Sequence, residues 1–292
     1  MLTISHERGC IMSDTIRLAD VETLIRLSIS EDIAGGDITS QAIFKPEAAS
    51  RAAIVSKQQG VFCGSDMVRY AYEMIDPRVS VSPKAHDGDT IGIKETLMTL
   101  SGPTVSVLSG ERIALNFIQR MSGIATRTSH VVSLLKNTNI KLLDTRKTLP
   151  GFRALDKYAV KTGGGTNHRM GLYDMVMIKD NHIRAAGGIA KAVIMVRERY
   201  GSRYLIEVEA ANQDEVREAV AAGADIIMLD NMDTPAMKAA VELIRKRAKI
   251  EVSGNMDEER IKGIRELDVD YISMGALTHS VTAFDCSMEF DA

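Results

Sequence analysis

Five cationic side chains fall within a short stretch of the sequence and are the first candidates for chemistry. They are Arg146, Lys147, His168, Arg169 and Lys179. Arginine binds carboxylate or phosphate through a planar, two-pronged guanidinium, whereas lysine acts as a compact point charge. A mixed set therefore suits a ligand with several anionic groups. The alternative is a solvated charged face, which like charges disfavour unless an anion offsets their repulsion.

Three consecutive glycines, Gly163–Gly165, stand just ahead of His168 and Arg169 in the stretch GGGTNHRMG. Glycine lets the backbone approach another group closely or adopt a positive φ. Residues 141–184 contain nine Lys and Arg against four Asp, a local net charge of +5. Because the whole chain carries −3, the remainder carries −8. The basic character is local, and the adjacent cation pair indicates an anion site.

Two carboxylates, Glu209 and Asp230, each follow an apolar run of strand length. Oxygen ligands of this kind hold Mg²⁺ together with the phosphate groups of a substrate, and the metal keeps several waters. The sequence therefore predicts a magnesium site at Glu209 and Asp230. An alternative stays open, in which the two carboxylates only pair with nearby lysines and arginines.

Small residues follow two later runs, as Ser253-Gly254-Asn255 and as Gly275-Ala276. In α/β barrels the loops after the last strands commonly offer backbone N–H groups to a phosphate. Each dipeptide alone is a weak signal, but the pair predicts a phosphate site. His182 and His279 are expected to be hydrogen-bonded structural residues. Met177, Met228 and Met274 are expected to fill the core.

These candidates share a position, because each lies where an apolar run ends. The runs alternate with helix-like stretches at residues 189–200, 213–222 and 235–246. Strand, helix and strand at this spacing predict successive units of a parallel α/β barrel, in which function gathers at the carboxyl ends of the strands. The runs are IKLLDTRK, MVMIKDN, YLIEVE, DIIMLDN, IEVSGN and YISMGA.

In the first third of the chain the apolar residues are spaced differently. Helical spacing over residues 16–29 ends at the loop EDIAGGDIT, and a helix over residues 67–74 lies among three short strand-like runs, AAIVS, GVFCG and VSVSP. This order predicts a small domain of mixed helices and strands. Helical spacing returns over residues 110–135, with an expected break at Ser122-Gly123.

Length and composition limit the possibilities further. A chain of 292 residues is long enough for a barrel and a smaller domain. The small net charge gives no general basis for binding nucleic acid or an anionic membrane, and no apolar run reaches membrane-spanning length. Cys10, Cys63 and Cys286 form neither a disulfide framework nor a zinc motif, so we expect a soluble protein of the reducing cytoplasm. Met12 is a second plausible start, and residues 1–11 are expected to be a disordered extension.

The sequence resembles the quinolinate phosphoribosyltransferases over about residues 29–280. The resemblance implies a type II phosphoribosyltransferase fold, in which an N-terminal α/β sandwich domain at residues 1–114, rejoined by the tail 281–292, precedes an open α/β barrel at 115–280. The carrying motifs are EDIAGGDIT, ERIALNFIQRMSGIAT, LDTRKTLPGFRALDKYAVKTGGGTNHRMG, MIKDNHI, EVE, LDN, EVSGN and GALTHS. Asn255 departs from the glycine of many relatives, although asparagine also occupies left-handed turns.

The resemblance also implies an activity and a set of roles. Family members transfer phosphoribosyl from 5-phosphoribosyl-1-pyrophosphate to quinolinate with decarboxylation, using Mg²⁺, and work as homodimers. By the matching motifs, Arg112 reaches a substrate carboxylate across the dimer interface and Lys147 reaches both substrates. Glu209 and Asp230 contact the ribose hydroxyls and Mg²⁺. The residues that line the quinolinate pocket are Arg146, His168, Arg169 and Lys179. Those that bind the 5-phosphate are Ser253, Gly254 and Gly275.

Three other functions compete with this one. A barrel aldolase would use Lys147 or Lys179 to form a Schiff base, although the surrounding cations argue for additional anion sites. A related transferase would act on another pyridine acid. A nucleic-acid-binding protein would use the basic segment, which contains only Phe152, Tyr158 and Tyr173 as aromatic residues and lacks the corresponding motifs. We therefore expect no nucleic-acid partner and no membrane partner.

Overall fold

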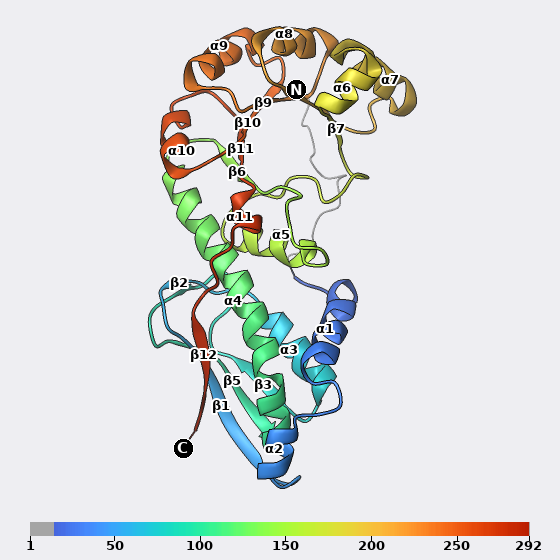
Figure 1. The fold of residues 1–292 in the computed structure, drawn as a ribbon. Helices are drawn as coiled ribbons and strands as arrows, with labels where there is room; N and C mark the ends of the chain where they lie inside the picture. The colour runs from blue at the N-terminus through green and yellow to red at the C-terminus, as the bar shows by residue number, and fades with distance from the viewer. Residues whose placement is uncertain (1–14, 292) are drawn as a thin grey trace. The chain divides into compact units, whose positions relative to one another are not determined.

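The computed structural model describes residues 15–291, and they form two compact units (Figure 1). Residues 131–147 and 165–276 make up the barrel unit, and residues 15–130, 148–164 and 277–291 make up the N-terminal unit. The division expected at residue 115 falls inside the helix α4 (Thr104–Leu134), which belongs to the N-terminal unit as far as His130. The expectation for residues 1–11 lies outside the described part of the chain.

The barrel unit is built on a parallel sheet of six strands in the order β6-β11-β10-β9-β8-β7. Its strands are rich in buried Ile, Val, Leu and Met, as a sheet covered by helices requires. This parallel six-stranded sheet agrees with the open α/β barrel that the resemblance implies. The strands are β6 (Lys141–Leu143), β7 (Val176–Ile178), β8 (Ile206–Ala210), β9 (Ile226–Asp230), β10 (Lys249–Ser253) and β11 (Tyr271–Ser273).

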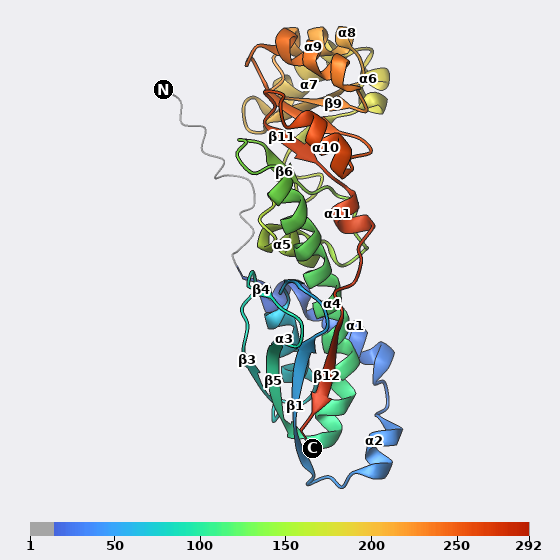
Figure 2. The ribbon, with the colours of Figure 1, turned by 90° about the vertical axis from the view of Figure 1, so that its left-hand side faces the viewer.

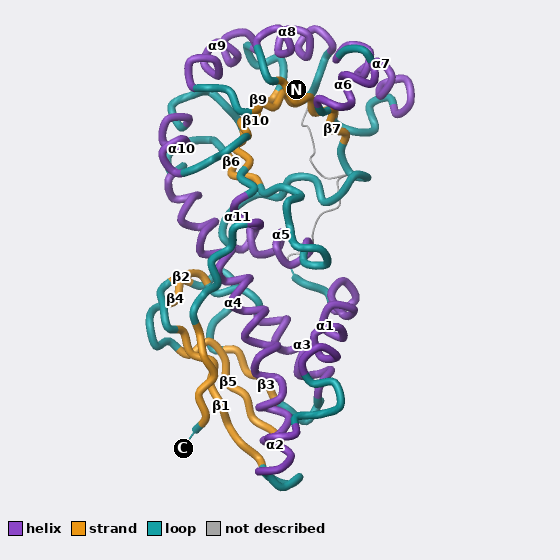
Figure 3. Tube along the Cα trace, in the orientation of Figure 1, coloured by secondary structure: helices purple, strands orange, loops and turns teal. Residues whose placement is uncertain are grey.

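Helices between the strands follow the outer side of the curved sheet (Figure 3). Three of them begin at polar caps, where the side chains of Asn212, Asp233 and Asp257 accept hydrogen bonds from free backbone N–H groups of the first turn. The caps fix where each strand-to-helix loop ends, and so hold the strand ends in place. The helices are α6 (Asp180–Ala186), α7 (Ile189–Tyr200), α8 (Gln213–Ala222), α9 (Thr234–Ile244) and α10 (Glu258–Ile264).

The N-terminal unit contains an antiparallel sheet of four strands in the order β12-β1-β5-β3 (Figure 2). Its edge strand β12 comes from the end of the chain, so the tail pairs with β1. A separate pair joins β2 to β4. The strands are β1 (Ala49–Ser56), β2 (Gly60–Val61), β3 (Ser80–Pro83), β4 (Thr90–Ile91), β5 (Thr96–Pro103) and β12 (Cys286–Phe290).

Helices cover this sheet and bury one apolar core with it. Ile54 and Leu100 of the sheet meet Tyr72 of α3 and Leu115 of α4 in that core. The hydroxyl of Tyr72 donates to the carbonyl of Val107, which satisfies the one polar atom of a fully buried ring. The remaining helices are α1 (Leu18–Asp32), α2 (Ile38–Ile43), α3 (Ser65–Ile75), α5 (Arg153–Thr162) and α11 (Ala276–His279), which lies at the boundary of the two units.

The break expected at Ser122-Gly123 is wrong, because α4 runs without interruption for 31 residues. Both residues serve contacts instead. The hydroxyl of Ser122 accepts from the N–H of Cys63 at 2.9 Å and donates to its carbonyl at 3.0 Å. A side chain at Gly123 would collide with the carbonyl oxygen of Thr282, so glycine is required for close approach of the returning tail.

The described part of the chain can be compared with the expectations for membrane spans and for the cysteines. Among the described residues, no helix combines the length and apolar character needed to cross a membrane. Cys63 and Cys286, the two cysteines in the described part, are free and buried. Burial raises the pKa of both thiols, which keeps them protonated and inert.

Candidate active site

Four candidate residues of the barrel unit, Lys179, Glu209, Asp230 and Ser253, lie on one face of its sheet at the strand ends. Side chains two residues apart on a strand share a face, and strand register aligns the neighbours. Met177 of β7 is in register with Glu207 of β8, and Glu251 of β10 is in register with Met228 of β9. Ser253 is in register with Asp230. The residues on this face are Met177, Lys179, Glu207, Glu209, Met228, Asp230, Glu251 and Ser253.

The loop that carries His168 and Arg169 is held against β6. Thr166 forms a parallel bridge with Leu143, and the buried carboxylate of Asp144 accepts from the His168 N–H at 2.8 Å and from the Asn167 amide at 2.7 Å. Sequence reasoning did not single out Asp144. This residue fixes where the loop turns toward the inner face of the sheet.

The glycines ahead of this loop allow the turn. Gly164 has φ +87°, a left-handed conformation that favours glycine. A side chain at Gly163 would collide with the carbonyl oxygen of Ala125. The glycines thus end α5 and let it lie close to α4.

His168 points into the sheet and meets two buried glutamates. Its Nε2 lies 3.1 Å from Glu207 Oε2 and 3.4 Å from Glu251 Oε2, and the imidazole is 7% exposed. The N–H is well aligned with neither oxygen, as expected when one donor is shared between two acceptors. All four carboxylate oxygens otherwise lack a hydrogen bond. The other ring nitrogen, Nδ1, accepts from the backbone N–H of Arg169 at 2.7 Å.

Proton positions in this cluster follow from those contacts. Burial disfavours a charged imidazole, but hydrogen bonding to Glu207 and Glu251 outweighs burial and raises the pKa of His168 to about 10. Burial and the neighbouring Glu251 raise the pKa of Glu207. The cluster therefore keeps its protons at neutral pH as a coupled set. Because Nδ1 accepts a hydrogen bond from the Arg169 N–H, Nε2 is the ring nitrogen whose proton faces the two glutamates.

This arrangement decides against a metal ion in the cluster. The facing atoms of His168, Glu207 and Glu251 lie within 4.8 Å of one another, close enough to consider shared coordination. A neutral imidazole carries one ring proton, and a metal-bound imidazole usually donates its other N–H to an acceptor. Here the other nitrogen accepts, so Nε2 has no lone pair to offer a cation.

Arg169 brings a half-buried guanidinium to the same region. It donates to the carbonyl of Met175 at 3.2 Å and contacts the sulfur of Met177 at 3.5 Å. Burial and the charge of Arg146 lower its pKa. Among the described residues no carboxylate forms an ion pair with Arg169. Two guanidiniums thus lie near one another, and one of them lacks an anionic partner.

At the end of β7, the Nζ atom of Lys179 lies 2.8 Å from Oε2 of Glu209 at the end of β8. The alternative left open by the sequence, a carboxylate paired with a nearby cation, is therefore present at Glu209. His182 accepts from the Lys179 N–H through Nδ1 at 3.0 Å, which caps α6. Its structural role agrees with the sequence prediction.

The ends of β9 and β10 form one connected turn region. Asn231 donates its N–H to the carbonyl of Ser253 at 3.1 Å, and Asn255 donates its amide to Asn231 at 3.2 Å. Gly254 has φ +95°, and a side chain there would collide with Asn231. Asn255 has φ +46°, so asparagine adopts the left-handed turn expected of it.

The remaining candidates have separate positions. Arg146 and the exposed Lys147 follow β6, and the Lys147 N–H donates to Thr145 Oγ1 at 3.1 Å. Gly275 follows β11. Arg112 is an exposed residue of α4 in the N-terminal unit. It lines a pocket of about 430 Å³ together with residues of the EDIAGGDIT loop, among them Asp37.

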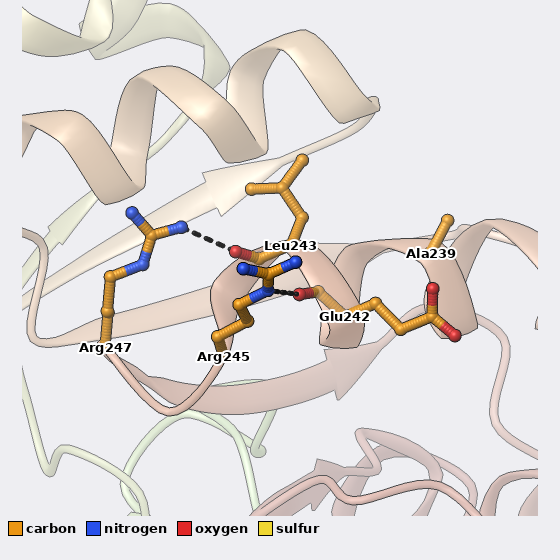
Figure 4. A pocket seen from close by; sticks show the side chains of 5 residues that line it. All are labelled: Ala239, Glu242, Leu243, Arg245 and Arg247. Atoms are coloured by element: carbon orange, nitrogen blue, oxygen red, sulfur yellow. Dashed lines mark hydrogen bonds between the residues drawn. The ribbon is translucent and has the colours of Figure 1, made fainter.

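A larger surface hollow of about 660 Å³ lies elsewhere on the barrel unit (Figure 4). Arg245 and Arg247 line it and donate to carbonyls of the last turn of α9. Because α9 leads directly into β10, the hollow lies at the amino edge of the sheet. It is therefore unrelated to the candidate residues at the carboxyl edge.

Two family models together match nearly all the described chain. The quinolinate phosphoribosyl transferase C-terminal domain matches residues 124–289, and the N-terminal domain of the same enzyme matches residues 37–122. The chain belongs to the quinolinate phosphoribosyltransferase family. Membership decides against the Schiff-base aldolase and the nucleic-acid-binding protein that the sequence had left open.

Curated relatives agree with this assignment over most of their length. A probable nicotinate-nucleotide pyrophosphorylase [carboxylating] from Bacillus subtilis is 46% identical, with 89% of each chain covered. A mitochondrial quinolinate phosphoribosyltransferase [decarboxylating] from Nicotiana tabacum is 40% identical over 93% of this chain and 82% of its own.

Solved structures share both units of the fold. NadC from Streptococcus pyogenes superimposes with a TM-score of 0.91 at 38% identity, covering 95% of this chain and 98% of its own. The nicotinate-nucleotide pyrophosphorylase from Francisella tularensis gives a TM-score of 0.90 at 40% identity, with the same coverage. The two-domain α/β fold expected from the sequence is thereby confirmed.

Proposed function

We propose that the carboxyl edge of the barrel sheet carries the family reaction. In that reaction phosphoribosyl passes from 5-phosphoribosyl-1-pyrophosphate to quinolinate, and CO₂, pyrophosphate and nicotinate mononucleotide are released. One observation carries the assignment of the edge. Arg169 is a half-buried guanidinium close to Arg146, and it lacks a carboxylate partner among the described residues. A charge held in this way is stabilised when an anion arrives.

Quinolinate supplies the anions that this cationic set lacks. Its two carboxylates are proposed to contact Arg146, Arg169 and Lys179. His168, which the resemblance places in the same pocket, is only 7% exposed against Glu207 and Glu251, so we propose instead that it fixes the loop behind these cations. Arginine suits a carboxylate because its planar fork donates two parallel hydrogen bonds. Lys147 is exposed on the loop after β6, where its long side chain is proposed to reach both substrates.

The second substrate is proposed to lie along the ends of β8 to β11. Glu209 and Asp230 would contact the ribose hydroxyls, and Ser253, Gly254 and Gly275 would hold the 5-phosphate. The positive φ of Gly254 and Asn255 turns the backbone sharply at this edge. Successive backbone N–H groups in such turns form concave sites for anions.

Glu209 and Asp230 fit a magnesium ion by their chemistry. Lys179 uses Oε2 of Glu209, and Asn231 uses Oδ2 of Asp230. Each carboxylate therefore keeps a second oxygen outside these bonds, of the type that Mg²⁺ prefers. When bound, Mg²⁺ would neutralise charge on the departing pyrophosphate.

The protein's own contribution is charge and alignment. In water, two polyanions repel one another, and the cations of the strand ends offset that repulsion. The same contacts align the pyridine nitrogen with C1 of the ribose. Once the nitrogen is ribosylated it is cationic, and it stabilises the carbanion left when the adjacent carboxylate departs as CO₂. The residues therefore need to bind and orient, and no general base is required.

We also propose a homodimer in which Arg112 serves the partner's site. Arg112 is exposed and has no ion pair among the described residues. Large apolar side chains are exposed on α1 and α2 of the same unit, with Leu27 61%, Ile38 82% and Ile43 66% exposed. Exposed apolar residues beside an unpaired arginine suit a protein interface.

A direct assay tests the proposed function. The purified protein is incubated with quinolinate, 5-phosphoribosyl-1-pyrophosphate and Mg²⁺, and nicotinate mononucleotide is measured by chromatography. We expect product that depends on all three, and none after chelation of the metal. Nicotinate serves as the competing acceptor, because faster turnover of nicotinate would assign the protein to another pyridine acid. No product from either acid would overturn the proposal.

A further inference from the structure

Two glutamates of the barrel interior have no place in the reaction described above. Glu207 and Glu251 lie within β8 and β10, and their side chains are 0% and 1% exposed. Apart from the shared contact with His168, none of their four oxygens has a hydrogen bond. Burying carboxyl groups with so few partners costs stability, and apolar residues of similar size would stabilise the sheet more. A function is therefore needed to explain them.

The contacts of His168 show what that function is. With its proton on Nε2 directed at the two carboxyl groups, the ring leaves Nδ1 free to accept from the Arg169 N–H. If the ring turned over or changed tautomer, this bond would be lost. The two glutamates thus select one tautomer and one orientation of His168, and His168 in turn fixes the backbone of Arg169.

The position of the Arg169 guanidinium depends on that backbone. Its side chain passes along β7, where it contacts the carbonyl of Met175 and the sulfur of Met177. Both acceptors are uncharged and both contacts are long, so the side chain relies on its backbone anchor for placement. A shift of the anchor would move the cation that the quinolinate carboxylate requires.

We propose that Glu207 and Glu251 are positioning residues, which hold His168 through its Nε2–H and thereby place Arg169 to receive a carboxylate of the acceptor substrate. The proposal rests on the proposed function. One acceptor is enough to hold one N–H, so either glutamate alone suffices. The pair acts by hydrogen bonding, and its negative charge works against binding of an anionic substrate.

Paired substitutions separate hydrogen bonding from charge. Glu207→Gln/Glu251→Gln removes both carboxylates but keeps amide oxygens as acceptors. Glu207→Leu/Glu251→Leu removes both the charge and the acceptors. Each single leucine variant keeps one acceptor. Steady-state kinetics with quinolinate and with 5-phosphoribosyl-1-pyrophosphate are measured for all of them, alongside thermal unfolding.

The double leucine variant is expected to raise KM for quinolinate at least about 20-fold, since a misplaced cation loses substrate contacts. Its KM for the sugar pyrophosphate should stay within about twofold, and its thermal unfolding should remain cooperative, which would show that the barrel is intact. The double glutamine and single leucine variants should stay within about fivefold in kcat/KM. A lower KM for quinolinate in both double variants would show that charge alone matters and would overturn the proposal.

The imidazole tautomer gives a test that needs no double variant to fold. Long-range ¹⁵N–¹H spectra of histidine-labelled wild type, with His168 assigned by His168→Gln, should show the proton on Nε2 and none on Nδ1. A proton on Nδ1, or a divalent metal that copurifies and disappears in Glu251→Gln, would overturn the inference. An inactive wild type with the Nε2 tautomer would instead reject the proposed function alone.

Discussion

Lys179 and Glu209 form an ion pair of 2.8 Å between the ends of neighbouring strands, although they are proposed to serve different substrates. Lys179 is 43% exposed and Glu209 is 18% exposed, so solvent screens the contact and its contribution to stability is small. When the substrates bind, the lysine can turn to a quinolinate carboxylate and the glutamate to the ribose. In the absence of substrate, the two proposed binding groups, the Lys179 ammonium and the Glu209 carboxylate, therefore neutralise one another.

Replacing Lys179 tests this use of the pair. Lys179→Ala should raise KM for quinolinate by about tenfold or more, because a charge contact to a carboxylate is lost, with little change in melting temperature. The matched control is Lys249→Ala, which breaks the ion pair with Asp270 at the amino edge of the same sheet. Equal kinetic effects of the two substitutions would remove Lys179 from the substrate site.

Lys147 is expected to contribute to both substrates. Lys147→Ala should lower kcat/KM by about a thousandfold, since one side chain supplies charge to both polyanions in the transition state. Lys141→Ala is the control, because Lys141 is an exposed lysine at the start of the same strand β6. Turnover of purified Lys147→Ala within tenfold of the control would contradict the assigned role.

The buried cluster predicts how stability depends on pH. Burial disfavours a charged imidazole, but the contacts with Glu207 and Glu251 outweigh burial and raise the pKa of His168 from 6.5 to about 10; because the three groups are coupled, this is the pKa at which the cluster as a whole loses a proton. A raised pKa stabilises the fold fully below pH 6.5, and this stabilisation is lost as pH rises through about 10. Between these limits the melting temperature of the wild type should fall more than that of His168→Gln, by at least about 3 °C, which corresponds to roughly 1 kcal/mol. If the melting temperatures of the two proteins changed with pH in parallel, the contacts of His168 with Glu207 and Glu251 would not stabilise the fold.

The shared site predicts complementation between two inactive variants. Arg112→Ala and Lys147→Ala should each be inactive alone. After subunit exchange, a mixed dimer contains one site with neither defect, so up to about a quarter of wild-type activity should return, since half the dimers are mixed. Exchange is verified by native mass spectrometry of differently tagged subunits. Verified mixed dimers without activity would show that Arg112 does not act across the interface.

Much of the barrel unit follows from sequence because its strands and helices alternate at regular spacing. Helices α7 and α8 begin and end where the periodicity places them, and each predicted strand run overlaps one observed strand. The residues at the ends of these runs could be identified because a polar residue that follows a buried strand marks the carboxyl edge. The helix break at Gly123 failed for a local reason, since that glycine accommodates a distant segment of chain.

Glu207 and Glu251 escaped prediction although a signal was present. Each precedes a candidate by two residues on the same strand, Glu209 and Ser253, and therefore shares its face. A glutamate inside a strand normally indicates a solvent-facing position, and only the three-dimensional contact with His168 shows that both are buried. Asp144 was missed for a similar reason, because its role is to bind the backbone of a loop more than twenty residues away.

Substitution of Arg169 tests the central claim most directly, namely that the cations at the carboxyl edge of the sheet bind the anionic groups of the substrate. Arg169→Ala should lower kcat/KM for quinolinate by about a thousandfold or more, because it removes a desolvated charge contact. Its melting temperature should change by no more than about 2 °C, because no carboxylate among residues 15–291 forms an ion pair with Arg169. Arg199→Ala, on the exposed face of α7, is the control. Near-normal turnover of quinolinate by purified Arg169→Ala would contradict the account.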